Sequence, residues 1–95
     1  MNVKKTDMIK SNDTGFLIFM KSKFPLYHQS NIFFRDLHYG VMEFLEKKKV
    51  TTTYSEGEQI AREIAVHFEK KNIFKKVNQQ GWVLLYPDFV AKKVS

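Results

Sequence analysis

Apolar residues recur with helical spacing between residues 30 and 49, in the segment SNIFFRDLHYGVMEFLEKKK. The positions that share one face of such a helix are Phe34, Leu37, Val41, Phe44 and Leu45. Ser30 or Asn31 can cap its beginning, and lysines 47–49 suit the negative end of its dipole. Gly40 falls within the pattern, where the missing side chain lets another element pack closely. The pattern predicts an amphipathic helix with one buried face.

A second helical pattern covers residues 54–71, YSEGEQIAREIAVHFEKK. Its apolar row consists of Ile60, Ile64 and Phe68, widened by Ala61 and Ala65. Ser55 and Glu58 have the spacing of a capping box, in which each side chain binds the backbone N–H of the other residue. Asn72 suits the left-handed conformation in which many helices end. This segment is predicted to be a capped helix.

The pattern of residues 14–24, TGFLIFMKSKF, leaves two structures open. Asp13 or Thr14 can cap a short helix that stops before Pro25, because proline disfavours helical geometry in the preceding residue. The run is apolar on all sides, so residues 16–24 also fit a buried strand.

Residues 73–87, IFKKVNQQGWVLLYP, predict two strands joined by a turn at residues 78–81, where Gly81 can take a positive φ. Trp82, Leu84 and Tyr86 share one face of the second strand, and Val83 and Leu85 share the other. Both faces are apolar. Either the hairpin is covered on both sides, or one face, with Trp82, Leu84 and Tyr86 as the candidate interface, meets a partner or a second copy of the chain.

The predicted order is therefore three helices followed by a two-stranded hairpin, a small α+β fold of the winged-helix kind. The 95 residues suffice for one domain, expected over residues 14–91. Residues 1–13 are expected to form a flexible arm, and residues 92–95 form a basic tail.

From about residue 24 to residue 86, the chain resembles winged-helix domains and, within that group, DEP domains. The matching features are the aromatic-rich segment FFRDLHYGVMEFLEKK, the acid-led segment SEGEQIAREIAVHFEKKNI and the aromatic strand GWVLLY. A tryptophan that is usual in the DEP helix is replaced by Phe44 or a neighbour, and the last strand ends in Tyr-Pro. The resemblance implies a non-catalytic module that docks onto proteins or acidic membranes, with no active site.

The net charge of +6 favours anionic partners. It comes from 14 lysines and only two arginines against 10 acids. Lysine acts as a point charge, whereas arginine makes the two-pronged contacts that read guanine or grip phosphate. The composition therefore indicates diffuse attraction to an anionic surface, or simply solubility, more than base reading.

A winged helix that binds DNA inserts the helix before its hairpin into the major groove. Here that helix begins with Glu56 and Glu58, and only Gln59 and Arg62 are suited to reading bases. Leading acids oppose entry into the phosphate field of DNA, so nucleic acid is the less favoured partner.

Another basic surface remains available for a protein, a membrane or DNA phosphates. Its candidate residues are Lys70, Lys71, Lys75, Lys76, Asn78, Gln79 and Gln80, with Lys4, Lys5 and Lys10 on the arm and Lys92 and Lys93 on the tail. Arg35, among aromatic residues, is a candidate interface anchor.

The sequence predicts no catalytic, cofactor or metal site. It has no cysteine, no glycine-rich phosphate loop and no histidine pair at metal-binding spacing among His28, His38 and His67. The longest apolar run, residues 16–20, is too short to span a bilayer, and the polar N-terminus lacks the apolar core of a signal peptide. A cytoplasmic location is expected.

The first functional hypothesis is a non-catalytic module that binds a protein partner or an anionic surface, with a homodimer included. The alternative is a small DNA-binding winged-helix regulator that uses hairpin and arm lysines. A third hypothesis is a structural subunit of a larger assembly.

Overall fold

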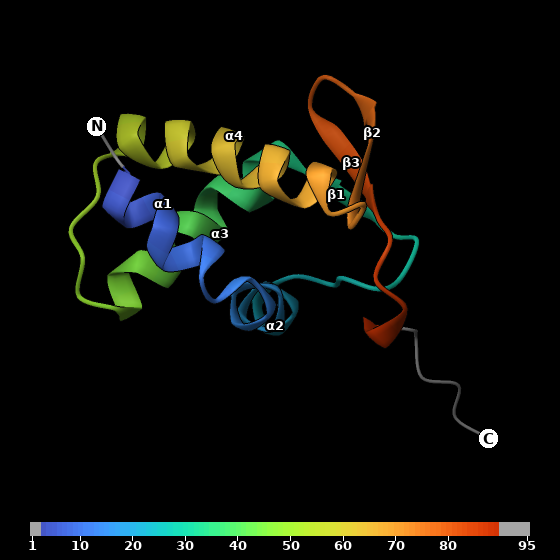
Figure 1. Ribbon diagram of the computed structural model, residues 1–95, viewed down its shortest axis with the longest axis horizontal. Coiled ribbons are helices and arrows are strands. Elements are labelled where there is room, and N and C mark those ends of the chain that lie inside the picture. The colour runs from blue at the N-terminus through green and yellow to red at the C-terminus, as the bar shows by residue number, and fades with distance from the viewer. Residues whose placement is uncertain (1–2, 90–95) are drawn as a thin grey trace.

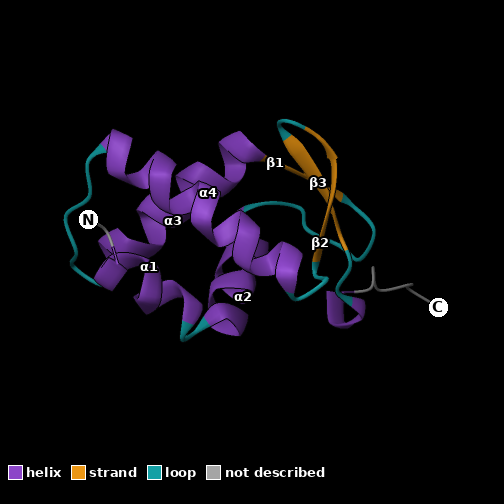
Figure 2. Cartoon of the chain, turned by 45° about the horizontal axis from the view of Figure 1, so that its top comes forward, coloured by secondary structure: helices purple, strands orange, loops and turns teal. Residues whose placement is uncertain are grey.

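The computed structural model describes residues 3–89, and within them the chain has a mixed α+β fold. Four α-helices accompany a small three-stranded antiparallel sheet (Figure 1). The elements in chain order are α1 (Val3–Lys10), α2 (Asp13–Lys23), β1 (Asn31–Phe33), α3 (Phe34–Lys47), α4 (Tyr54–Lys70), β2 (Phe74–Asn78), β3 (Gly81–Leu84) and a 3-10 turn, η1 (Pro87–Phe89). The strands gather at one end of the molecule, and helices fill the rest (Figure 2).

Helices α3 and α4 are the two amphipathic helices that the apolar patterns predicted. Every apolar position of the two predicted rows is buried. Gly40 of α3 faces Met20 of α2, and a Cβ atom at Gly40 would collide with the Met20 sulfur. The predicted close approach at Gly40 is confirmed, because α2 packs on α3 at this point.

The beginning of α4 differs from the prediction. Thr53 caps the helix: its Oγ1 accepts a hydrogen bond of 3.1 Å from the Glu56 backbone N–H. In return, Glu56 Oε1 accepts a bond of 2.9 Å from the Thr53 N–H. The capping box predicted at Ser55 and Glu58 is therefore wrong, because Thr53 and Glu56 offer the same spacing two residues earlier. The predicted left-handed stop at Asn72 is confirmed by its φ of 61°.

A third strand replaces the expected beginning of α3. Residues 31–33 pair with β3 in antiparallel register, so the sheet has the order β1-β3-β2 rather than two strands. Ile32 lies opposite Trp82 and is buried, while its neighbours Asn31 and Phe33 are exposed. This alternation is that of a half-buried strand, and α3 begins only at Phe34, with neither Ser30 nor Asn31 as its cap.

The hairpin of β2 and β3 carries an irregularity between Lys76 and Asn78. In the turn, Asn78 Oδ1 accepts a hydrogen bond of 2.8 Å from the Gln80 N–H. Gly81 does not take the positive φ expected of it. A Cβ atom there would lie 3.4 Å from the Ile32 carbonyl oxygen of the neighbouring strand, which is an ordinary contact, so packing does not require a glycine at this position.

Residues 13–23 form a helix, which decides between the two structures left open by the sequence. Phe16, Leu17 and Met20 are its buried residues, and Phe24 ends it in an extended conformation before Pro25. The Phe16 ring stacks on Phe68 of α4 at 6.4 Å and meets Phe44 of α3 edge-on at 5.3 Å. Helix α2 therefore closes the core beneath α3 and α4.

The structure has helix α1 where the sequence predicted a flexible arm over residues 1–13. Ile9 is fully buried and Thr6 nearly so, one turn apart on the same face. Lys5 Nζ donates to the Thr51 carbonyl oxygen at 2.8 Å and lies 3.1 Å from Glu56 Oε1. These contacts attach the first helix to α4 and to the loop before it. The predicted basic tail over residues 92–95 lies outside the described residues.

Candidate interaction face on α4 and the hairpin

The apolar residues predicted as an interface face inward. Trp82 and Leu84 are 4% and 0% exposed, packed with Ile32, Phe34 and Phe74. Tyr86 is half-buried and contacts the Phe89 ring at 4.8 Å. Trp82 and Leu84 are therefore core, whereas Tyr86 keeps part of its side chain exposed. The alternation of apolar residues marked both faces and did not indicate which one the helices would cover.

The predicted polar residues of the hairpin are all exposed: Lys75, Lys76, Asn78, Gln79 and Gln80. Lys70 and Lys71, at the end of α4, are exposed as well. Lys71 is already paired, since its Nζ lies 2.6 Å from Asp13 Oδ2. Within residues 3–89, Lys70, Lys75 and Lys76 form no ion pair, so their charges remain available to a partner.

A hollow of about 160 Å³ lies where the exposed side of α4 meets the hairpin. We call the surface around it the helix–hairpin face. Its residues are Phe34, Arg62, Ala65, Val66, Glu69, Lys76, Gln79 and Trp82. The lining is apolar and aromatic at Phe34, Ala65, Val66 and Trp82, with charged or amide side chains making up the rest. The sequence indicated Lys76 and Gln79 as candidate contact residues, but it did not show that they lie beside α4.

Three side-chain contacts involve residues of this face: a hydrogen bond, a cation–π contact and an ion pair. Trp82 Nε1 donates a 2.6 Å hydrogen bond to Glu69 Oε2, which ties the hairpin to α4. The Arg62 guanidinium lies 4.6 Å above the Phe34 ring and 3.2 Å from Glu58 Oε2. Stacking and pairing together favour this position of the exposed arginine side chain.

Aromatic side chains continue from this face along α3 and the beginning of α4. Arg35, the predicted anchor, is exposed with its guanidinium 5.7 Å above the ring of Tyr39. His38 is 4% exposed and contacts the rings of Phe34, Tyr39 and Tyr54. Tyr39 and Tyr54 are themselves exposed. Both arginines of the protein therefore rest on aromatic rings, on elements that border each other.

The acids at the beginning of α4 are engaged within the chain. Glu56 forms the capping box and an ion pair with Lys5. The hydrogen bond with the Thr53 backbone, followed by that with the Lys5 side chain, lowers the pKa of Glu56 below its ordinary value. Glu58 pairs with Arg62. The field of negative charge expected at this helix end is therefore partly compensated.

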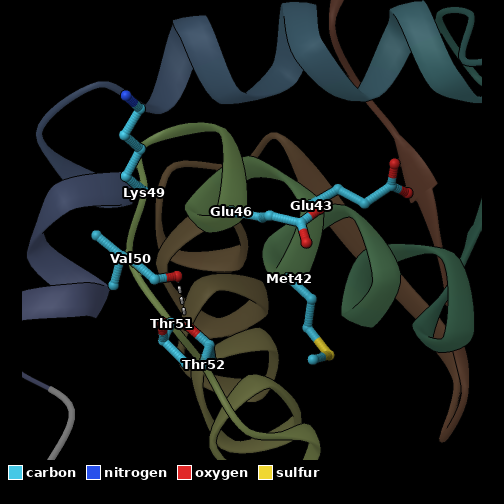
Figure 3. A pocket seen from close by; sticks show the side chains of 7 residues that line it. All are labelled: Met42, Glu43, Glu46, Lys49, Val50, Thr51 and Thr52. Carbon is cyan, nitrogen blue, oxygen red and sulfur yellow. Dashed lines mark hydrogen bonds between the residues drawn. The ribbon is translucent and has the colours of Figure 1, made fainter.

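Two other cavities each have a volume of about 470 Å³. One lies between α3 and the loop after it, and is lined by Met42, Glu43, Glu46, Lys49, Val50, Thr51 and Thr52 (Figure 3). In it, the Lys49 side chain points away from Thr51 and Thr52 (Figure 3). The other lies at the beginning of α4, lined by Ser55, Glu56, Glu58, Gln59 and Arg62. The sequence did not indicate either cavity.

The three histidines lie apart, each with a structural partner. His28 Nδ1 accepts from the Tyr86 N–H at 3.0 Å. His38 Nε2 lies 3.0 Å from the Tyr54 carbonyl oxygen, and His67 Nε2 lies 3.0 Å from Asp13 Oδ2. In the described part of the chain, no three His, Cys, Asp or Glu side chains gather in a group able to hold a metal ion.

Neither a protein-family model nor a curated protein nor a solved structure matches this chain. Over residues 3–89, no helix has the length and apolar character needed to cross a membrane. The surface with the clearest features of a binding site is the helix–hairpin face.

Proposed function

We propose that this chain is a winged-helix domain that binds a protein partner through the helix–hairpin face and has no catalytic role. The order of α2, α3 and α4 followed by the β2–β3 hairpin supports the winged-helix assignment. On this reading, β1 completes the sheet beside β3, and α1 is an addition before the domain. The likeness to DEP domains stays a prediction.

The hollow of the helix–hairpin face is the observation that carries the proposal. Protein interfaces combine an apolar centre with a polar rim, and aromatic residues and arginine are enriched among their strongest contacts. Here Val66 supplies exposed apolar surface beside the buried rings of Phe34 and Trp82, and Arg62, Lys76 and Gln79 supply polar groups around it. Val66 is 46% exposed, so a partner would gain apolar burial at this point.

The charge on this face is mixed. Arg62 and Lys76 are cationic, Glu69 is anionic, and Arg62 is already paired with Glu58. A nearly balanced rim suits the interspersed charges of a protein surface better than the uniform negative charge of duplex DNA.

A photo-crosslinking amino acid at position 66, in cells of the source organism, tests the proposal. We expect a defined cross-linked protein from position 66 and none from the control position Thr14, an exposed residue on α2. Arg62→Ala in the same chain should weaken the cross-link. Equal cross-linked products from both positions, or a yield from position 66 that Arg62→Ala leaves unchanged, would contradict this function.

DNA binding is the second candidate. Glu56 is paired with Lys5 and Glu58 with Arg62, so their negative charges oppose DNA less than the sequence alone indicated. Lys70, Lys75 and Lys76 would then contact phosphates without reading bases. Fluorescence anisotropy with a generic labelled duplex, at low and near-physiological salt, separates the candidates. Binding that is measurable at near-physiological salt, weaker there than at low salt and dependent on Lys75 and Lys76 would favour DNA, and absence of binding at both salt concentrations would exclude this candidate.

A further inference from the structure

A second surface, away from the helix–hairpin face, combines lysines with exposed apolar side chains. We call it the lysine–phenylalanine patch. Its residues are Ile18, Phe19, Lys21 and Lys23 on α2, Tyr27 in the loop after α2, and Lys47 at the end of α3. Neither the charge pattern nor the predicted helices singled out this surface in the sequence.

The lysines of this patch rest on aromatic rings. The ammonium groups of Lys23 and Lys47 lie 5.7 and 5.5 Å from the centre of the Phe19 ring. Lys21 Nζ lies 4.5 Å from the centre of the Tyr27 ring. Lysine stems can cover apolar surface in this way while the charge stays in water.

Few carboxylates neutralise these lysines. Within the described residues, the patch lysines form one ion pair, between Lys23 Nζ and Glu43 Oε1 at 3.6 Å, and both side chains are more than 40% exposed. Lys48 lies beside the patch, with its ammonium group 5.3 Å from the Phe44 ring. Phe44 in turn contacts Phe19 edge-on at 5.5 Å. The surface therefore carries a local excess of positive charge.

Apolar side chains occupy the middle of the patch. Ile18 is 57% exposed and Tyr27 is 42% exposed. On a helix, Ile18 neighbours Lys21 and Ser22, three and four positions later, and Phe19 neighbours Lys23, four positions later. The outer surface of α2 therefore combines a row of Ile18 and Lys21 with an adjacent row of Phe19 and Lys23.

We propose that the lysine–phenylalanine patch docks this protein on an anionic phospholipid bilayer. Lysines near such a surface are attracted to its negative potential, while Ile18 and Tyr27 reach the boundary between headgroups and acyl chains. A fluid bilayer can receive a convex surface of this kind. None of the three cavities described above is lined by a residue of the patch, so none of them offers a peptide a groove there.

The position of the patch leaves the proposed partner face free. Helix α2 lies at the bottom of Figure 1 and α4 lies along the top, with α3 between them. A domain resting on its α2 surface would present the helix–hairpin face to the aqueous phase. This inference does not rest on the proposed function, because it uses other residues and another kind of partner.

Co-sedimentation of the full chain with vesicles tests the proposal. We expect binding to vesicles that mix phosphatidylserine with phosphatidylcholine, and little binding to phosphatidylcholine alone. Each lysine near an anionic membrane accounts for about a fivefold change in partitioning, so Lys23→Gln with Lys47→Gln should reduce binding roughly 25-fold. Ile18→Ser should reduce it about fivefold through lost apolar burial.

Matched controls come from the hairpin. Lys75→Gln with Lys76→Gln removes the same charge, and Val77→Ser removes a similarly exposed apolar residue, so binding should be retained in both. Fluorescence of Trp82, the one tryptophan of the chain, reports whether each variant is folded. Equal losses in the patch and hairpin variants would overturn the proposal.

Two further results would also overturn it. One is absence of binding to phosphatidylserine vesicles by the folded protein. The other is binding that Ile18→Ser leaves unchanged and that soluble polyglutamate abolishes, since this would indicate an acidic protein segment as the occupant. Cross-linking from position 66 should survive the patch substitutions, so failure of this inference and failure of the protein-partner proposal give different results.

Discussion

Asp13 Oδ2 lies 2.6 Å from Lys71 Nζ, although 58 positions separate the two residues in the chain. His67 Nε2 lies 3.0 Å from the same oxygen. The beginning of α2 is thereby joined to the end of α4. Burial alone would raise the pKa of Asp13, but the hydrogen bonds from Lys71 and His67 outweigh it and hold the pKa below the ordinary value of 3.8.

Asp13→Asn should therefore lower the free energy of unfolding by about 1 kcal/mol at neutral pH, since one partner, Lys71, is largely exposed. A carboxyl group whose pKa is lowered by folding stabilises the folded state at pH values above its ordinary pKa. This stabilisation is lost as the pH falls through the pKa of the folded state. The difference between wild type and Asp13→Asn should shrink as the pH falls below 3.8. Urea unfolding followed by Trp82 fluorescence measures it, and a pH-independent difference would contradict the assignment.

The corrected capping box predicts an asymmetry between two neighbouring hydroxyl residues. Thr53→Ala removes the acceptor for the Glu56 N–H and should lower stability by about 1 kcal/mol. Ser55→Ala, inside the first turn, is the matched control and should change stability by less than about 0.5 kcal/mol. Thermal unfolding by circular dichroism compares them. A larger loss of stability from Ser55→Ala than from Thr53→Ala would instead support the capping box of Ser55 and Glu58 that the sequence predicted.

The contact between Gly40 and Met20 predicts non-additive substitutions. Gly40→Ala would normally favour a helix, but its Cβ meets the Met20 side chain in the core, so we expect destabilisation of about 1–2 kcal/mol. Met20→Ala leaves a cavity and should destabilise by about 2–5 kcal/mol. Together they should destabilise by less than the sum, because the new methyl occupies vacated space. Strict additivity in urea unfolding would show that the two side chains do not compete.

The bond from Trp82 to Glu69 predicts a graded response. Glu69→Ala leaves the indole N–H of a 4% exposed residue without its acceptor and should destabilise by about 1–3 kcal/mol. Glu69→Gln keeps an acceptor oxygen and should lose less. The tryptophan emission maximum should shift with Glu69→Ala if the hairpin loosens from α4. Equal effects of the two substitutions on stability would contradict a role for the hydrogen bond.

The two rows of apolar residues in α3 and α4 could be predicted because their spacing repeats every three or four residues over several turns. Strand β1 could not, since three residues carry little pattern and the strand exists only where β3 lies beside it. The two candidate capping boxes had the same spacing, and only the extended conformation of Thr53 decides between them.

The candidate site was only partly visible in the sequence. Lys75, Lys76 and Gln79 were found because a hairpin exposes polar residues, and Arg35 because it lies among aromatics. Their relation to Arg62 and Val66 was not visible, since nothing local states which side of α4 the hairpin packs on. The same limit concealed the lysines around Phe19, which come from two different helices.

The sequence by itself determined the α+β class, the amphipathic faces of α3 and α4, the left-handed stop at Asn72 and the excess of lysine. These follow from interactions within a few residues, where spacing and backbone preference decide. Only the tertiary structure decided that Trp82 and Leu84 are core, that residues 3–10 join the fold as a helix, and which charges remain unpaired. Burial and pairing depend on segments far apart in the chain, so no local pattern can specify them.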